Sequence, residues 1–224
     1  MSSHLDLDEQ EQLEKVKHFW NSYGNLISWA LVVVLLSYSG WNAWQWWQRD
    51  QGLKAAGMYE ELGRAAGAGD VERAGKISAE LKDRYGRTTY AEQGGLRVAQ
   101  LQFDKGQRDA AIASLSWVAD NAREGEYRAI ARLRLAALLS EQGKHDEALA
   151  LLAKDMPPDF TALVADRRGD VLLAQGKTAE AVTAYQQAWR AMDPALDYRR
   201  LIDAKLTTLG AAPAQDGAAS EAAR

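Results

Sequence analysis

The sequence predicts an all-α protein in which a single N-terminal transmembrane helix is followed by a solenoid of about four helix hairpins and a C-terminal capping helix. A long run from Leu26 to Trp47 contains no Lys, Arg, Asp or Glu. Downstream, a short glycine–alanine pattern recurs at a spacing that is typical of helical repeats. We find no segment with the alternating polarity that is typical of a half-buried strand.

The segment before the uncharged run is acidic. Residues 1–14 contain five carboxylate side chains and neither Lys nor Arg, and the first basic residues are Lys15 and Lys17. Arg49 and Lys54 follow the run. Because basic residues are nearly balanced on its two sides, the positive-inside rule does not fix the orientation. We expect residues 1–25 to form an N-terminal tail, either as a solvated extension or as a regulatory contact.

The uncharged run, residues 26–47, is predicted to cross a membrane as one helix. At a rise of about 1.5 Å per residue it spans about 33 Å, close to the ~30 Å hydrocarbon core of a bilayer. Aromatic residues gather at both ends, where an apolar ring with a polar N–H or O–H suits the membrane–water interface. The predicted interface residues are Trp20, Tyr23, Trp41, Trp44, Trp46 and Trp47, with Phe19 beside the first two.

Two other interpretations of this run are available. It could be an aromatic helix buried in a soluble core, although its length and the lack of a polar stripe argue against this. It could also be a signal peptide, with Ile27 to Leu36 as the apolar region and Ser37-Tyr38-Ser39 as a weak cleavage site. Signal peptides need a basic start and a small-residue cleavage site, whereas this chain has an acidic start and a bulky aromatic block. We therefore predict an uncleaved anchor.

The remainder of the chain is a repeat. Gly69, Gly106, Gly143 and Gly176 are separated by 37, 37 and 33 residues. Each copy predicts a helix hairpin, because glycine ends a first helix in the left-handed conformation and a small residue lets the second helix approach closely. The alanines five positions after the glycines are Ala74, Ala111, Ala148 and Ala181.

A second set of small residues supports the same register. Ala99, Ala136 and Gly169 each lie seven positions before one of the last three glycines, where a bulky side chain would push the paired helices apart. Three copies in register are the tetratricopeptide pattern, in which hairpins of about 34 residues stack into a superhelix. We expect this tetratricopeptide-like domain to span residues 48–210, with a break at Pro157-Pro158 between the third and fourth units.

A terminal helix is predicted to cover the open end of the solenoid. Asp193 can cap its N-terminus and Pro194 suits the first helical position, while Gly210 ends it. We expect residues 211–224, which are small, polar and rich in alanine, to be disordered. The apolar side of the capping helix is expected to comprise Leu196, Leu201, Ile202, Leu206 and Leu209.

Composition excludes several classes of chemistry. The chain has no cysteine, so it has neither disulfides nor thiolate metal sites, and its three histidines, His4, His18 and His145, are scattered. A net charge of −4 argues against nucleic acid as a partner. We find no phosphate-binding glycine loop and no nucleophile–base pair, so we predict no enzymatic activity, no cofactor and no metal. The charges of Asp166, Arg167, Arg168 and Asp170 are interpreted as a solvated face or as local ion pairs, in preference to a binding site.

A stack of helix hairpins presents a groove that is lined by the first helix of each pair, and a groove with mixed polarity suits an extended peptide or a partner helix. For the apolar members, packing between repeats is the competing interpretation. Extrapolation of the repeat predicts the groove residues Tyr59, Gln93, Leu96, Gln100, Phe103, Ile130, Leu133, Leu163, Asp166 and Asp170.

The order of these parts resembles the YfgM-like family of ancillary SecYEG translocon subunits, over about residues 9–209. The segments that carry the resemblance are EQLEKVKHFWNSYGN before the span, the tryptophan-rich residues 40–47, FDKGQRDAAIASL at 103–115 and VADRRGD at 164–170. None of these is a catalytic motif. The chain differs from the family pattern by a higher tryptophan content and a longer polar C-terminal tail.

The resemblance implies a bacterial inner-membrane protein with a cytoplasmic N-terminus and a periplasmic repeat domain. It also implies association with the SecYEG channel and with a membrane-anchored periplasmic chaperone of the PpiD kind, and assistance to secreted proteins that leave the channel. Two alternatives stay open: a structural scaffold for an envelope assembly complex, and a soluble periplasmic tetratricopeptide module that is released by cleavage near Gly40.

Overall fold

The computed structural model describes the backbone of residues 7–213 and the side chains of residues 12–213, so the predicted tail at 211–224 lies mostly outside the described residues. Every regular element in the described range is helical, which confirms the predicted fold class. The elements are α1 (Leu7–Gly67), α2 (Val71–Tyr85), α3 (Thr89–Asp104), α4 (Arg108–Asn121), α5 (Gly125–Glu141), α6 (His145–Leu152), the short 3₁₀ helix η1 (Pro158–Phe160), α7 (Thr161–Ala174), α8 (Thr178–Ala191) and α9 (Tyr198–Thr208).

The chain divides into two units, Met1–Leu53 and Lys54–Arg224, and α1 contributes residues to both. The first unit holds one helix that is long and apolar enough to cross a membrane, and none of its most apolar stretch is buried within the chain. The interpretation of this segment as a buried core helix is therefore wrong. The division after Leu53 lies several residues beyond the predicted domain start at residue 48.

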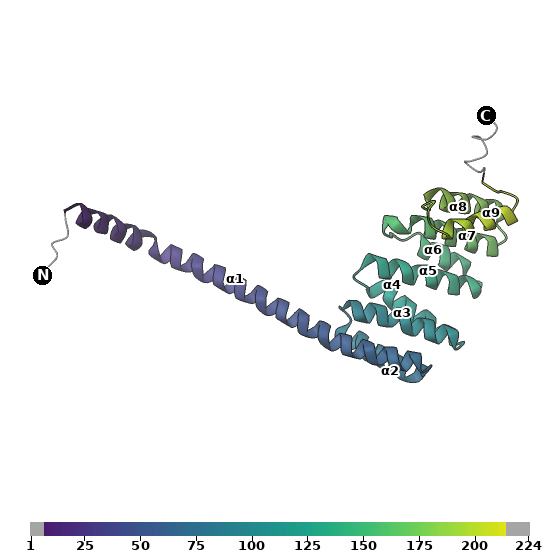
Figure 1. Cartoon of the computed structure of the whole chain (residues 1–224), viewed down its shortest axis with the longest axis horizontal. Helices are drawn as coiled ribbons and strands as arrows, with labels where there is room; N and C mark the ends of the chain where they lie inside the picture. The colour runs from purple at the N-terminus through teal and green to yellow at the C-terminus, as the bar shows by residue number, and fades with distance from the viewer. Residues whose placement is uncertain (1–6, 214–224) are drawn as a thin grey trace, which may run out of the picture. The chain divides into compact units, whose positions relative to one another are not determined.

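The second unit is a stack of four helix hairpins, as the repeat predicts. Its pairs are the end of α1 with α2, α3 with α4, α5 with α6, and α7 with α8, and Figure 1 shows these helices succeeding one another along the stack in chain order. The glycines that end the first helices all have positive φ, for example +74° at Gly106. There the backbone N–H of Gln107 donates to the carbonyl of Gln102 at 2.8 Å, which closes the helix end.

The small residues of the repeat lie where the helices touch. Ala111, Ala148 and Ala181 are fully buried, and so is Ala136. At Gly169 a Cβ atom would come within 2.5 Å of the Tyr185 ring, so α7 and α8 approach closely only because this position has no side chain. The predicted register of the hairpins is therefore confirmed.

The third hairpin departs from the others because its second helix is short. Helix α6 ends at Leu152, after only about two turns, and an irregular segment leads to η1. Pro157 and Pro158 lack backbone N–H donors and cannot continue the helix. Pro157 packs close to Gly125, where a Cβ atom would meet the proline ring at 3.0 Å.

The capping helix exists but begins later than predicted. Helix α9 starts at Tyr198, because Asp193 caps a turn instead: its carboxylate accepts from the backbone N–H of Ala195 at 2.9 Å. Ile202 and Leu206 are completely buried against α8, as expected. Leu196 and Leu201, which the sequence placed on the same apolar side, are about half exposed, and that part of the prediction is wrong.

Candidate functional site

A hollow of about 180 Å³ lies on the face formed by the first helices of successive hairpins, which we call the groove face (α3, α5 and α7). Gln100 and Phe103, both predicted groove residues, line it from α3. Phe103 keeps 36% of its surface exposed, and Gln100 is exposed with its amide bonded to Asp104 at 2.8 Å. Two of the predicted groove residues therefore line a hollow on this face, and their role in binding stays a prediction.

Charged side chains complete the hollow, and the sequence analysis missed them. Arg134 and Glu141 line it from α5, and Arg167 lines it from α7. Arg134 and Glu141 lie four and eleven residues after Ile130, so the helical period that selected Ile130 would have found both. The Arg108 guanidinium lies 5.8 Å from the centre of the Phe103 ring and 3.6 Å from the Glu141 carboxylate. Since Glu141 pairs with Arg108, Arg134 is the exposed cation at the rim of the hollow.

Two further predicted residues join neighbouring helices. The Gln93 amide donates to the Tyr127 hydroxyl at 2.7 Å, from α3 to α5. The Tyr59 ring lies 5.8 Å from the Tyr90 ring, with the Arg97 guanidinium 5.9 Å from its centre. These contacts fix the spacing of the groove face. The half-buried side chains of Ile130, Leu133 and Leu163 pack against the hydrophobic clusters of the domain, which favours the packing interpretation for these three.

For Leu96 and Asp166 the prediction of an open groove position is wrong. Leu96 is 8% exposed and belongs to the main hydrophobic cluster. Asp166 is 1% exposed because α9 covers it. The sequence analysis predicted that the capping helix covers the end of the solenoid, but not that it covers Asp166 of α7.

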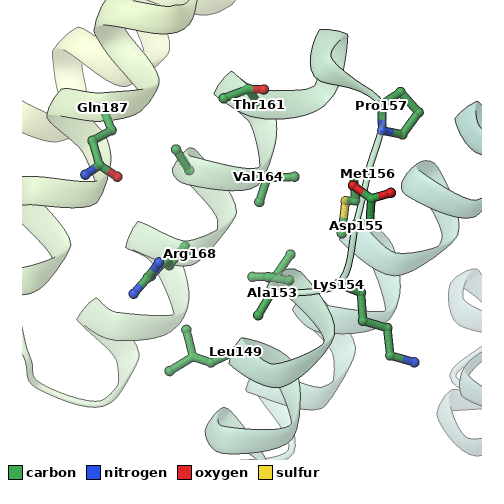
Figure 2. A pocket seen from close by; sticks show the side chains of 12 residues that line it. Leu149, Ala153, Lys154, Asp155, Met156, Pro157, Thr161, Val164, Arg168 and Gln187 are labelled. Carbon is green, nitrogen blue, oxygen red and sulfur yellow. The ribbon is translucent and has the colours of Figure 1, made fainter.

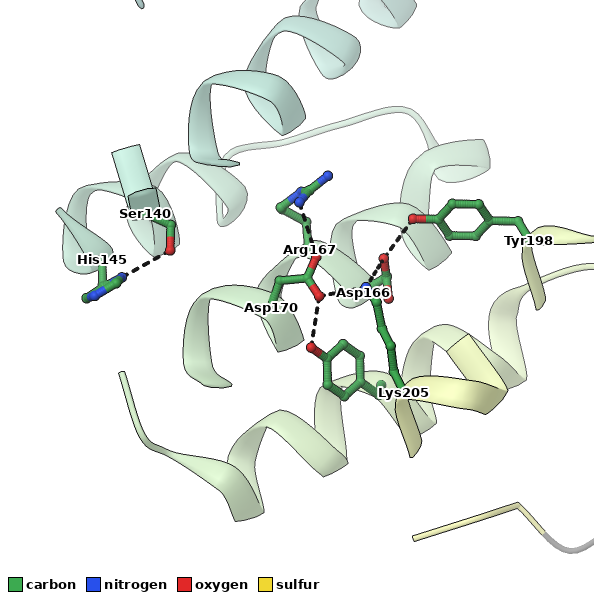
Figure 3. A network of polar contacts seen from close by, with 8 residues as sticks. Ser140, His145, Asp166, Arg167, Asp170, Tyr198 and Lys205 are labelled. Carbon is green, nitrogen blue, oxygen red and sulfur yellow. Dashed lines mark hydrogen bonds and ion pairs between the residues drawn. The ribbon is translucent and has the colours of Figure 1, made fainter. Parts of the chain in front are cut away.

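A polar network joins α7 to α9 (Figure 3). The Lys205 ammonium lies 2.8 Å from Asp166 and 2.6 Å from Asp170. The Tyr198 hydroxyl donates to Asp166 at 2.8 Å, and Arg167 pairs with Asp170 at 3.1 Å. The local ion-pair interpretation of this charged stretch is therefore confirmed for Arg167 and Asp170, which lie three residues apart, whereas the buried Asp166 pairs with Lys205 of α9.

The two tyrosines of this network are kept neutral. Burial raises the pKa of Tyr198 to about 12, and its hydrogen bond to Asp166 acts in the same direction. Burial and a 2.8 Å hydrogen bond to Asp170 raise the pKa of Tyr185 well above its usual value. Both hydroxyls therefore remain donors to carboxylates over any physiological pH, which suits a structural role for the network.

A larger hollow, of about 480 Å³, lies where the short α6 leaves space against α7 and α8 (Figure 2). Leu149, Met156 and Val164 form its apolar part. Arg168 from α7 and Gln187 from α8 extend into it from neighbouring helices (Figure 2). Arg168 thus points away from the network that holds its neighbours, and the irregular segment after α6 shapes this cleft.

A buried carboxyl group stands at the start of α3. Glu92 is 1% exposed and accepts a hydrogen bond from the backbone N–H of Arg123 at 2.7 Å, while its second oxygen has no partner among the described residues. Burial raises the pKa of Glu92 above its usual value, and the neighbouring Glu124 adds to the rise. Since Glu92 ties the α4–α5 turn to α3, we assign it to the fold rather than to the groove.

The aromatic residues predicted for the membrane interface are exposed on α1, for example Trp41 at 64% and Trp46 at 69%. Trp44 and Trp47 stack on each other at 5.4 Å, and Phe19 contacts Tyr23 at 5.2 Å. Trp20 lies over Gly24, and all six predicted interface side chains are exposed. Their placement at the lipid interface stays a prediction.

No group of His, Asp or Glu side chains that could hold a metal ion occurs among residues 12–213. His145 contacts the Ser140 hydroxyl at 3.1 Å in a hairpin turn (Figure 3), and no third side chain among residues 12–213 bonds to it to form a triad.

The fold is that of a helical-repeat domain, preceded by a helix with one apolar stretch long enough to cross a membrane. The model of the tetratricopeptide repeat-like domain family matches residues 17–211. The chain is 32% identical over 218 residues to the ancillary SecYEG translocon subunit of Neisseria gonorrhoeae. This alignment covers 93% of the chain and 100% of the Neisseria protein. The Escherichia coli protein of the same name is 28% identical over 182 residues, with 80% and 86% covered. The chain belongs to the family of ancillary SecYEG translocon subunits.

Proposed function

We propose that this protein is a single-pass inner-membrane subunit that associates with the SecYEG translocon and binds proteins at the exit of the channel. The observation that carries the proposal is its full-length similarity to relatives named ancillary SecYEG translocon subunits. In this arrangement residues 26–47 cross the membrane, the N-terminus is cytoplasmic and the tetratricopeptide-like domain is periplasmic. The protein acts by binding and not by catalysis.

The groove face is the proposed binding surface. The hollow between Gln100, Phe103 and Arg134 combines an exposed aromatic ring with a rim cation, so it accepts an apolar side chain next to an acceptor group. The partners that fit are a membrane-anchored periplasmic chaperone of the PpiD kind and secreted chains leaving the channel. Anchoring keeps the groove at a high effective concentration near these partners, so weak contacts suffice.

Photo-crosslinking in membranes that carry the full-length protein tests this function. A photoreactive residue at Phe103 reports on the groove face, and one at the exposed Ala113 of α4 is a matched control on the second helix of the same hairpin. We expect adducts with a channel subunit, a membrane-anchored chaperone or secreted precursors from Phe103 only. Adducts confined to unrelated envelope proteins would instead support a structural scaffold, and strong adducts from Ala113 alone would refute the groove assignment.

A further inference from the structure

One side of α1 carries a row of small polar side chains in and just before the apolar run, whereas Ser37 and Gln45 of the run lie off this side. Six residues of α1 lie three or four positions apart and therefore share one helix face: Asn25, Ser28, Val32, Leu35, Ser39 and Asn42. All but Val32 and Leu35 are polar. We call these six residues the amide face. The opposite side, with Leu26, Ala30, Val33, Trp41 and Trp44, is apolar and aromatic except for Ser37.

The polar groups of the amide face have no partner within the described chain. Asn25, Ser28, Ser39 and Asn42 are exposed and make no side-chain hydrogen bond in the described range. Ser37 differs, because its hydroxyl donates to the carbonyl of Val33 at 2.8 Å and is satisfied within its own helix. An unsatisfied amide in hydrocarbon is costly, so the amide face needs hydrogen-bonding groups from outside the chain.

A hollow lies on the same side of the helix. Ser39, Asn42 and Ala43 form its floor between the larger side chains of Tyr38 and Trp46, and it measures about 510 Å³. Asn42 lies about 8 Å inside the last tryptophan of the predicted span, and Ser39 about one turn deeper. Small residues flanked by aromatic walls allow the backbone of a second helix to approach, and intervals of three and four residues suit a left-handed helix crossing.

Charge argues against a second copy of this chain as the occupant. Arg49 lines the membrane-surface edge of the hollow, with its guanidinium 3.5 Å from Gln45. Two parallel copies joined through the amide face would bring their Arg49 side chains together. The adjacent Asp50 already has an interaction within its own chain and does not line the hollow. An occupant with an acceptor or carboxylate at this level complements Arg49, whereas an identical helix repels it.

We propose that the amide face is the docking surface for a transmembrane helix of a different membrane protein. That helix carries a hydrogen-bonding side chain opposite Ser39 and Asn42 and a hydrogen-bond acceptor, best a carboxylate, near Arg49. The inference rests on the proposed function, since it requires residues 26–47 to lie in a membrane beside other spanning helices. It adds which side of the span is buried in protein and which faces lipid.

Since the chain has no cysteine, single-cysteine variants test the face directly. Ser39→Cys lies on the amide face, and Ser37→Cys is a matched control two residues away on the opposite side. A thiol-linked photoreactive probe is attached to each full-length variant in native membranes, and adducts are identified by mass spectrometry. We expect several-fold more adduct with one membrane-spanning protein of the translocon assembly from position 39 than from position 37.

Other outcomes overturn the proposal. Equal adducts from both positions mean that α1 has no preferred face. Efficient oxidation of the Ser39→Cys variant to a disulfide-linked dimer means that a second copy occupies it. Absence of adducts from position 39, while Phe103 still crosslinks to the translocon, refutes the amide face but leaves the proposed function standing. Adducts from position 39 without adducts from Phe103 would instead support the amide face and refute only the groove assignment.

Asn42→Leu provides a second test that does not depend on folding, because it makes the span more apolar. We expect its co-purification with the spanning partner in mild detergent to weaken about threefold to twentyfold, the range for one interhelical hydrogen bond. Gln48→Leu, on the other side of α1, is the control and should retain the partner. Equal retention by both variants would contradict the docking surface.

Discussion

Replacement of Gly169 by alanine tests the hairpin register at its tightest point. The added Cβ atom would lie 2.5 Å from the Tyr185 ring, 0.9 Å short of the 3.4 Å at which ordinary contact begins. Tyr185 cannot withdraw freely, because it is 1% exposed and its hydroxyl is bonded to Asp170 at 2.8 Å. Either α7 and α8 separate or the tyrosine loses its hydrogen bond.

The magnitude follows from three contributions. Overpacking of a filled interface costs about 1–3 kcal/mol. A lost hydrogen bond to a carboxylate costs about 1.5–3 kcal/mol. The better helix propensity of alanine returns about 1 kcal/mol. If both costs apply, the net loss in the free energy of unfolding is about 1.5–5 kcal/mol, which lowers Tm by about 3–20 °C in a domain of this size; a single cost gives a loss near or below the lower end of this range. Gly169→Leu should lose more.

The assay is thermal unfolding of the purified full-length protein in detergent, followed by circular dichroism at the helical band. Gly75 of α2 is the matched control, since it is helical and a Cβ atom there would meet nothing within 4 Å. Gly75→Ala should raise Tm by a few degrees through propensity alone. If Gly169→Ala melts like Gly75→Ala, the close approach of α7 and α8 at Tyr185 is absent and the register argument fails.

Three other substitutions, the first with a matched control, have defined outcomes in the same melting assay. Lys205→Met leaves the buried Asp166 carboxylate without its cation and should cost about 3 kcal/mol of unfolding free energy. Arg168→Met removes an exposed cation and should change stability by less than about 0.5 kcal/mol. Equal effects of the two substitutions would contradict a structural role for the network. Because burial raises the pKa of Glu92, the native protein loses stability as pH rises above the unfolded glutamate pKa of about 4.3. The Tm of Glu92→Gln should therefore rise relative to that of the wild type between about pH 4 and 7. Parallel pH profiles of Tm for the two proteins would contradict a raised pKa of Glu92. Asp70→Ala removes the cap on α2, a 3.0 Å bond from the N–H of Arg73, and should cost about 1 kcal/mol; an unchanged Tm would show that water replaces the cap.

The sequence predicted the repeat well because its signals are local. A glycine that ends a helix, as at Gly106, needs a positive φ whatever its surroundings. Ala111 and Ala136 mark close helix contacts that recur with the repeat, so one register explains them together. The start of α9 was mispredicted because Asp193 can cap either a helix or a turn, and both satisfy the same side chain.

The groove face was predicted less well, because a side chain that points toward this face can be either exposed to solvent or covered by an adjacent helix. Gln100 and Phe103 reach the hollow, whereas Leu96, one turn earlier on the same helix, is enclosed by α4 and α5. Helical periodicity gives a direction for each side chain and does not say how much of the neighbouring helix covers it. Arg134 lies one turn after Ile130 on the same helix face and was not included in the predicted set.

By itself the sequence determined the uncharged span with its aromatic ends, the four hairpins and their register, and the resemblance to a translocon-associated family. These features rest on the composition of short segments and on fixed periods, which a linear chain displays in full. Only the tertiary structure decided that Asp166 is held by Lys205 from a helix 39 residues away, and that the short α6 opens a cleft beside Arg168. Such features depend on which distant elements meet, and that is set by the packing of the whole domain.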